Sequence, residues 1–139
     1  MSNVPKTYSI KVTEGQMELE ESTLENNAAE GVIIGDLWGY ISDVNQVIVN
    51  MYGAKDKSEF IGKNVLEFLV KEERDRAVKS SLDSIATEKA KTHQYRVQLK
   101  DGKQITVEVT SDFLRNKQGD IIGLIEIMFY PKIALHFLF

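Results

Sequence analysis

The sequence predicts a single α+β domain, in which a five-stranded antiparallel sheet carries short helices on one face. Two alternating stretches flank Asp101-Gly102, a dipeptide that strongly favours a β-hairpin. Before them, several short segments with their own capping residues lead into one longer helical segment. The order along the chain is two strands, then helices, then three strands. That order favours helices packed on one face of an antiparallel sheet.

Composition limits the classes of function. The chain has 139 residues, enough for one domain with a hydrophobic core, and its net charge of −4 argues against broad attraction to nucleic acid or an anionic membrane. The absence of cysteine excludes disulfides, thiol nucleophiles and iron–sulfur clusters, and it suits a reducing cytoplasm. No segment approaches the roughly 20 apolar residues of a membrane span, and the N-terminus lacks the apolar run of a signal peptide. We therefore expect a cytoplasmic protein.

The N-terminal part predicts an extended segment and a flanking helix. Residues 7–12 alternate apolar and polar side chains, as a strand or an extended arm does. Thr13 can cap a helix from about Gln16 to Glu30, which Gly31 would end. The apolar stripe of this helix is thin, so we expect it to pack on something else, such as a second copy of the chain.

Two predicted strands lead to the first helix of the domain. Residues 32–36 and 40–44 favour strands, with Trp38 in the tight turn between them. Trp38 would be either an interaction anchor or a side chain packed on the helices. Asn45 is a good N-cap, because its side-chain oxygen can accept from the free amides of a first helical turn. Gly53 would then supply the left-handed stop of a short helix.

Further capping signals divide the helical region. Asp56 with Glu59, and Asn64 with Glu67, have the spacing of capping pairs at the starts of two more short helices. Residues 71–90 predict a longer helix, acidic in its first turn as the helix dipole prefers. Its apolar residues recur at helical spacing and form one stripe, which consists of Val78, Leu82 and Ile85.

The last third of the chain predicts three strands. Residues 92–100 and 103–112 alternate, so each strand has one buried and one solvated face, as in an antiparallel sheet. Residues 121–130 are apolar on both faces apart from Glu126, which predicts a strand that is central or covered.

This order of elements, with these residues, resembles a PAS domain, and most closely the sensory boxes of two-component histidine kinases. The resemblance runs from about residue 26 to residue 129, and it is carried by EGVIIGDLWGYISDVN, KSEFIGKN with VLEFL, KEERDRA, QLKDGKQITVEV and QGDIIGLIEI. It implies a division into an arm and flanking helix (1–25), a PAS sensory domain (26–130) and an apolar tail (131–139). The tail ends in IALHFLF, which we expect to dock on a partner chain or on the chain's own sheet.

The resemblance implies a sensory function. In this family the sheet and helices enclose an apolar pocket, and signals leave through the sheet or flanking helices, often across a homodimer. We therefore expect a small apolar or weakly polar ligand and an output kinase or other effector outside this chain. The alternative is a ligand-free dimerisation or interaction module. An enzyme is disfavoured, because Glu126, Asp43 or His93 would have to serve and no acid, base and nucleophile converge; no catalytic residue and no metal site is predicted.

Twelve residues are predicted to line the pocket, or alternatively to fill an ordinary core. Among them, Tyr52 and Tyr95 would be the polar handles for a ligand, because a buried tyrosine hydroxyl needs a hydrogen-bond partner. The predicted ligand-binding set is Ile33, Val44, Ile48, Tyr52, Val65, Phe68, Val78, Leu82, Tyr95, Val97, Val107 and Ile125.

The cofactor is left unknown, although two groups are disfavoured. Photoactive flavin PAS domains carry a reactive cysteine after the motif asparagine; here Val65 follows Asn64 and the chain has no cysteine, which excludes covalent flavin chemistry. The strand positions that would hydrogen-bond a flavin are apolar as well. Haem-binding relatives offer a histidine from the longer helix, where this chain has none. His93 lies just beyond and is interpreted as a core or rim histidine with one satisfied nitrogen.

Overall fold

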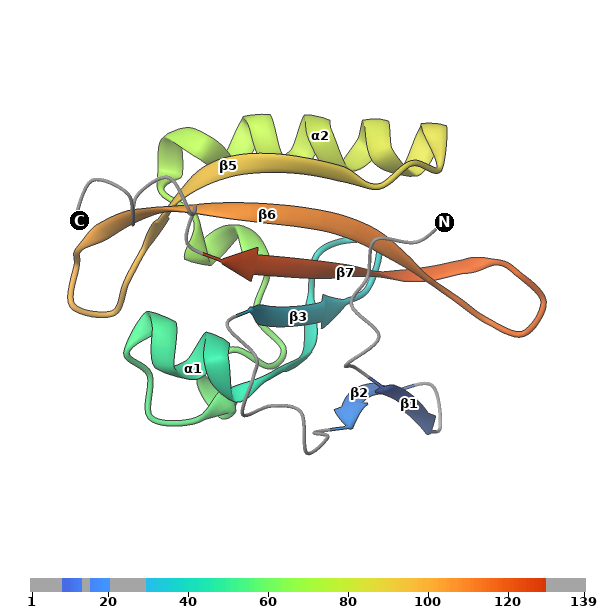
Figure 1. Cartoon of the computed structure of the whole chain (residues 1–139), viewed down its shortest axis with the longest axis horizontal. Coiled ribbons are helices and arrows are strands. Elements are labelled where there is room, and N and C mark those ends of the chain that lie inside the picture. Colours follow the sequence, from blue (N-terminus) through green and yellow to red (C-terminus); the bar gives the residue numbers. More distant parts are fainter. Residues whose placement is uncertain (1–8, 14–15, 21–29, 130–139) are drawn as a thin grey trace, which may run out of the picture.

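The fold is a five-stranded antiparallel sheet with its helices on one face, as the computed structural model of residues 9–13, 16–20 and 30–129 shows (Figure 1). The order of the strands in the sheet is β4-β3-β7-β6-β5, and every neighbouring pair is antiparallel. The predicted fold class is therefore confirmed. The strands are β3 (Gly31–Gly35), β4 (Ile41–Val44), β5 (Lys91–Gln98), β6 (Gln104–Arg115) and β7 (Ile121–Phe129).

Asn45 connects the sheet to the first helix, α1 (Gln46–Tyr52). Its side-chain oxygen accepts from the backbone N–H of Ile48 at 3.2 Å, which is the predicted N-cap, and from that of Val32 in β3 at 3.0 Å. Gly53 ends α1 with φ of 76°, in the left-handed region that favours glycine. One asparagine thus fixes both where α1 begins and how it lies against the sheet.

The two other predicted short helices are single 3-10 turns, η2 (Lys57–Glu59) and η3 (Val65–Phe68). A third 3-10 turn, η4 (Lys71–Glu73), begins the segment predicted as the longer helix. The capping box of Asn64 and Glu67 is formed at the start of η3, as predicted. The pair of Asp56 and Glu59 is formed only in part. Asp56 caps η2, whereas the Glu59 carboxylate accepts from the backbone N–H of Lys55 and from the Lys100 ammonium.

The longer helix, α2 (Arg74–Thr87), runs beside β5 (Figure 1). Between β5 and β6 the chain turns at Asp101-Gly102, and the predicted hairpin is confirmed. Its loop is longer than two residues, because Leu99 and Lys103 close it with a backbone hydrogen bond. Gly102 has φ of 90°, which a side chain would strain.

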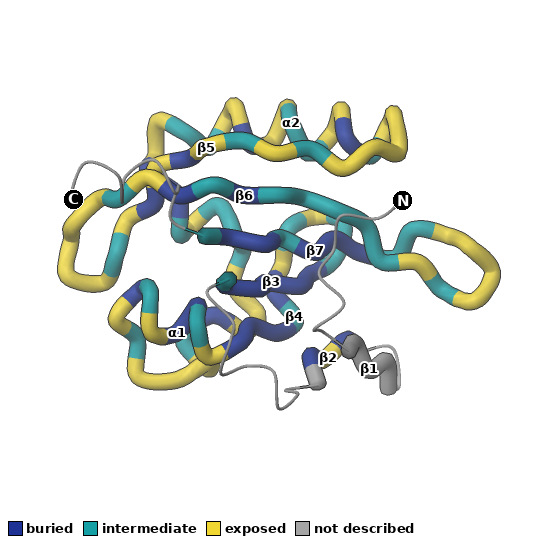
Figure 2. Tube along the Cα trace, in the orientation of Figure 1, coloured by how far each residue is buried: buried dark blue, intermediate teal, exposed yellow. Residues whose placement is uncertain are grey.

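The two faces of the sheet carry separate apolar clusters, and β3 and β7 are buried along most of their lengths (Figure 2). The larger cluster packs α1 and η3 on the helix face, around side chains such as Ile48, Phe60 and Val107. The smaller cluster covers the opposite face, where Ile34 and Ile125 are completely buried. A strand buried on both faces explains why the sequence of β7 is apolar on both faces.

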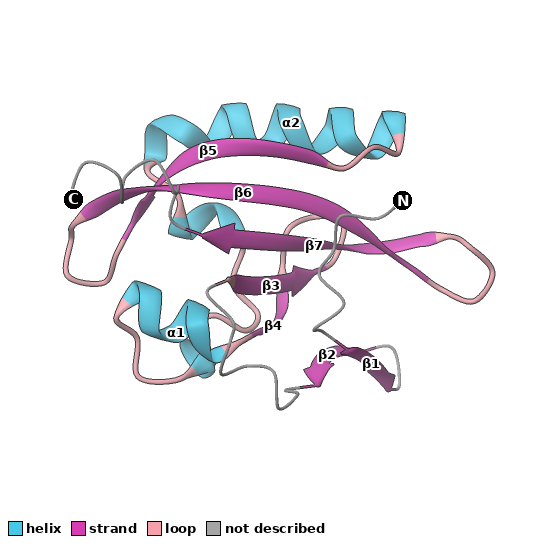
Figure 3. Cartoon of the chain, in the orientation of Figure 1, coloured by secondary structure: helices cyan, strands magenta, loops and turns pink. Residues whose placement is uncertain are grey.

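The opposite face is covered by an N-terminal hairpin of β1 (Ser9–Thr13) and β2 (Gln16–Glu20) (Figure 3). The strand prediction for residues 7–12 is confirmed where the structure describes it. The prediction of a flanking helix from Gln16 is wrong over Gln16–Glu20, and residues 21–29 lie outside the described residues. Met17 and Leu19, two residues apart, both point onto the smaller cluster, and this period of two belongs to a strand. Gly31 is the first residue of β3.

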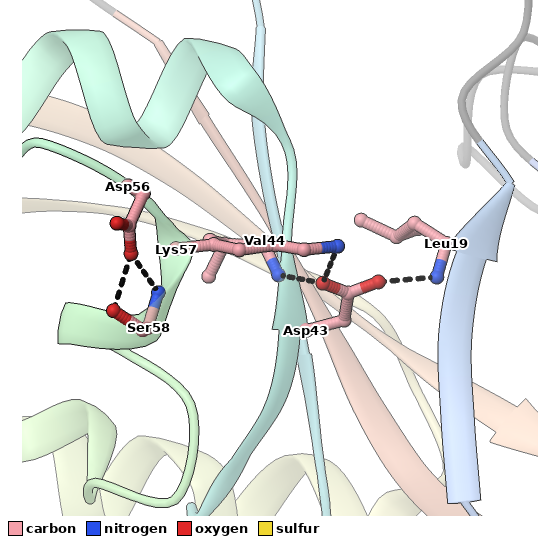
Figure 4. Close-up of polar contacts among 6 residues, drawn as sticks. All are labelled: Leu19, Asp43, Val44, Asp56, Lys57 and Ser58. Carbon is pink, nitrogen blue, oxygen red and sulfur yellow. Dashed lines mark hydrogen bonds and ion pairs between the residues drawn. The ribbon is translucent and has the colours of Figure 1, made fainter.

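A buried carboxylate fastens this hairpin to the sheet (Figure 4). Asp43 of β4 has 1% of its surface exposed, and its Oδ2 accepts from the backbone N–H of Leu19 at 2.7 Å. Its Oδ1 accepts from the backbone N–H of Val44 at 2.9 Å and from the Lys57 ammonium at 3.1 Å. The carboxylate therefore joins β2, β4 and η2 and has partners on both oxygens, which fits a structural role.

Candidate functional site

A mostly apolar cavity with a volume of about 240 Å³ lies between α2 and the sheet. Its floor comes from Ile33 of β3 and from Leu124 and Glu126 of β7, while α2 forms a side wall. The turn between β3 and β4 contributes Trp38, and η3 contributes Val65. The wall is thus mostly apolar, as in small-molecule sites.

The apolar stripe of α2 borders this cavity without closing it. Val78, Leu82 and Ile85 all line the cavity, yet 40% of Val78 and 62% of Leu82 remain exposed. Trp38, on the opposite rim, is 77% exposed. A helix normally buries its apolar stripe against the core, so this arrangement leaves apolar surface that a bound molecule would cover.

Polar contacts hold the N-terminal end of α2 to the edge of the sheet. Glu73 accepts from the backbone N–H of Arg96 at 2.8 Å and from the Arg76 guanidinium at 3.0 Å. The Arg96 hydrogen bond, assisted by Arg76, keeps the pKa of Glu73 below its ordinary value. The Arg76 guanidinium also lies over the Tyr95 ring, 4.4 Å from its centre. These contacts fix one end of α2 beside β5.

Glu126 is the one charged side chain in the wall of the cavity within the described part of the chain. It lies opposite Ile33 in the β3–β7 register and opposite Ser111 in the β6–β7 register. The Ser111 hydroxyl donates a short hydrogen bond to Glu126 Oε2. Burial raises the pKa of Glu126 to about 7, although the Ser111 hydrogen bond acts in the opposite direction. The cavity therefore contains a carboxyl group that holds its proton more tightly than an ordinary glutamate does.

The predicted site residues divide into three groups. Four of them line the cavity, namely Ile33, Val65, Val78 and Leu82. Seven others belong to the packed core on the same face: Val44, Ile48, Tyr52, Phe68, Tyr95, Val97 and Val107. Ile125 lies on the opposite face, against Met17 and Leu19, so its assignment to the pocket is wrong.

The two tyrosines predicted as polar handles make contacts within the protein. The Tyr52 ring packs edge-on against Phe60 and Phe68, and its hydroxyl lies 3.9 Å from Met128 Sδ. Burial raises the pKa of Tyr52 well above its ordinary value. Burial also raises the pKa of Tyr95, opposed by a hydrogen bond with Ser80 of α2. Both rings are thus parts of the core rather than of the cavity wall.

His93 is a partly buried histidine beside Tyr95, with ring centres 5.9 Å apart. Its Nε2 has no hydrogen-bond partner among the described residues, and the same holds for the buried Ser84 hydroxyl of α2. No group of three or more potential ligands for a metal ion occurs in the described part of the chain.

The sequence prediction missed Glu126 and Leu124 as cavity residues. The signal that could have found them is the pairing of β7 with β3, because Ile33 and Glu126 are register partners and share a face. Trp38 was predicted as an anchor or a packed side chain, and it lies exposed on the rim.

The family model described as the PAS fold matches residues 41–128, which include α2, β5, β6 and most of β7. The chain belongs to the PAS family. The matched region contains Glu126 and the apolar stripe of α2, whereas the hairpin of β1 and β2 lies before it. PAS domains are sensory and interaction modules of signalling proteins and are generally not enzymes.

Solved PAS structures share the fold of this PAS domain. The PAS domain of a protein from Colwellia psychrerythraea superposes with a TM-score of 0.71 at 19% identity, covering 78% of this chain and 91% of that one. A domain of a sensory box sensor histidine kinase/response regulator from Geobacter sulfurreducens has a TM-score of 0.59 at 24% identity, covering 73% of this chain and 83% of that one. A variant of the PAS-B domain of Drosophila melanogaster Cycle, with bound glycerol, has a TM-score of 0.63 at 17% sequence identity. The match covers 71% of this chain and 97% of that one. No curated protein sequence matches the chain.

Among the described residues of this PAS domain, no helix has the length and apolar character needed to cross a membrane.

Proposed function

We propose that this PAS domain is the sensory part of a signalling protein, and that it binds a small, mainly apolar molecule in the cavity between α2 and β7. The observation that carries the proposal is the open cavity itself, where Val78 and Leu82 of α2 stay exposed above an apolar floor. A ligand of suitable size would cover both side chains. The hydrophobic gain, about 25 cal/mol for each Å² removed from water, would favour its uptake.

The same geometry supports a route for the signal. α2 is fastened at its N-terminal end through Glu73, while its cavity-facing stripe has incomplete packing. A ligand that contacts both α2 and β7 would stabilise one position of α2 over others, and only such a difference can shift an equilibrium. We infer that the altered position is passed to a histidine kinase or another effector outside this chain, in the cytoplasm.

The experiment is a comparison of the native and denatured masses of the freshly purified protein. We expect an excess mass per chain that disappears on denaturation. Ser81→Trp, on the cavity-facing side of α2, should fill the cavity and abolish the excess, whereas Ile61→Trp, at an exposed position outside the cavity, should keep it. No excess in the native protein, or an excess that survives Ser81→Trp, would count against this site.

A second candidate function is homodimerisation through the rim of the cavity. Trp38, Tyr40 and Leu82 are large side chains with exposures of 77%, 51% and 62%, and aromatic residues are common anchors of interfaces. Light scattering of the full chain tests this candidate, and the double change Trp38→Ser with Leu82→Ser should convert a dimer into a monomer. Deleting the N-terminal residues is a poor test, because it would uncover the apolar cluster beneath Met17 and Leu19.

A further inference from the structure

The cavity combines an apolar wall with one carboxyl oxygen to which no described residue donates a hydrogen bond. Ser111 donates to Oε2 of Glu126, and no described residue donates to Oε1. The other polar side chains in the wall, Asn64 and Ser81, are uncharged. Asn64 is already paired, because its Oδ1 accepts from Leu66 N at 3.1 Å and its Nδ2 donates to Trp38 O at 3.1 Å. The only group in the described wall that can carry a charge and still accept a hydrogen bond is therefore this carboxyl.

We propose that the ligand is a small amine, with an apolar body in the cavity and a protonated amino group that donates to Glu126. The proposal rests on the proposed function and names the chemical class of ligand for that same cavity. Because the described wall contains no cationic side chain, an anionic ligand would meet a carboxylate without any compensating charge. An ammonium group supplies both the missing donor and the opposite charge, and charge-assisted hydrogen bonds are about twice as strong as neutral ones.

The groups that face Glu126 leave its charge uncompensated. From β6 it meets the neutral Ser111 hydroxyl, and from β3 the apolar Ile33. On β5 it interacts electrostatically with Tyr95, and His93 lies beside that ring. Lys91 of β5 is the register partner of Ser111 and so lies in the same row of the sheet as Glu126, but its ammonium is paired with Asp83 of α2. Arg76 of α2 lies over the Tyr95 ring and is already paired with Glu73.

Burial therefore governs the carboxyl, and its pKa is raised to about 7. A bound ammonium would favour the ionised form and lower that pKa. Proton release would accompany amine binding below neutral pH, so the affinity for an amine should weaken as the pH falls. A neutral hydrogen-bonding ligand would show the opposite trend or none.

The size of the cavity sets the size of the amine. A dry protein cavity of about 150 Å³ holds benzene. The volume of about 240 Å³ found here thus admits one ring with a short alkyl chain. Suitable probes are 2-phenylethylamine and propylbenzene, which differ only by an amino group in place of a methyl group.

The test is a titration of the full chain with each probe in turn. Binding is monitored through the fluorescence of Trp38, the only tryptophan of the sequence, which lines the cavity. At pH 8 we expect the amine to bind at least about tenfold more tightly than propylbenzene. From pH 8 to pH 6 its affinity should fall about tenfold, following the ionised fraction of Glu126. Glu126→Gln should remove both the preference and the pH dependence. Glu108→Gln, on the opposite face of β6 from Val107 and Val109, is the matched control and should change neither.

Ser111→Ala provides a second variant that keeps the carboxyl. Because the Ser111 hydrogen bond lowers the pKa of Glu126, its loss should move the midpoint of amine binding to higher pH. Propylbenzene binding as tightly as the amine at pH 8 would overturn the amine proposal while leaving the cavity a ligand site. Binding of neither probe, with no change in Trp38 fluorescence, would overturn the proposed function as well. Tighter amine binding at pH 6 than at pH 8 would also contradict the proposal.

Discussion

Replacing Glu126 by glutamine should make the unligated protein more stable at alkaline pH and leave it unchanged at acid pH. Burial raises the pKa of this carboxyl from its ordinary value of 4.5 to about 7. A raised carboxyl pKa means that the folded state holds the proton more tightly than the unfolded state does. The protonated Glu126 carboxyl therefore stabilises the folded state fully below about pH 4.5, and this stabilisation is lost as the pH rises through 7. The shift corresponds to about 3 kcal/mol of unfolding free energy.

The assay is urea unfolding of the native protein and the Glu126→Gln variant at several pH values between 4.5 and 8. The glutamine at position 126 stays neutral at every pH. Subtracting the unfolding free energies of the two proteins therefore cancels the contribution of all other titrating groups. We expect no difference at pH 4.5 and about 3 kcal/mol in favour of the variant at pH 8. Glu108→Gln should show no such trend. A difference that does not vary with pH, or that grows toward acid pH, would refute the raised pKa of Glu126.

Three further substitutions test the framework around the site. Asp43→Ala leaves buried N–H groups without an acceptor and should cost about 2–4 kcal/mol in urea unfolding. Lys57→Met should cost less than about 1 kcal/mol, because the Lys57 side chain is more than half exposed. Equal losses would contradict a hydrogen-bonding role. Gly123→Ala forces a methyl against the Gly35 carbonyl, so it should lower the Tm and speed amide exchange in β2; unchanged exchange would be inconsistent with this packing. Asn64→Ala breaks the capping box and should cost about 1 kcal/mol in thermal unfolding, and a neutral effect would argue against it.

The parts of the fold that depend on local signals could be predicted from the sequence. Asn45 and Gly53 fixed both ends of α1, and the capping box fixed the start of η3, because a cap acts on amides within one turn of itself. The hairpin between β5 and β6 likewise follows from Asp101-Gly102. Each of these features involves only residues close together in the chain.

The face of the sheet on which each side chain of β7 lies could not be predicted in the same way. Both faces of the strand are apolar, so alternation does not distinguish Ile125 from its neighbours. The face is decided by pairing with β3, about ninety residues earlier in the chain, which turns Glu126 toward the cavity. The second apolar face exists because Met17 and Leu19 of β2 cover it. Because the sequence predicts a helix over Gln16–Glu20, the strand that covers this second face of β7 could not be identified from it.

The opening of the cavity is also a long-range property. Helical spacing correctly grouped Val78, Leu82 and Ile85 on one stripe, and all three line the cavity. How far that stripe stands from the sheet depends on where α2 is fastened, and Glu73 makes that contact with the backbone of Arg96. Spacing within a helix carries no information about such a distance.

The most direct test of the central claim is a methyl NMR titration of the full chain with propylbenzene. The claim is that the ligand site is the cavity between α2 and β7. We expect shifts of the methyl signals of Ile33, Leu82 and Leu124, which line the cavity, and none for Val32 and Ile125 on the opposite face. Shifts at Val32 and Ile125, or no shift at the cavity methyls at the solubility limit of propylbenzene, would contradict it.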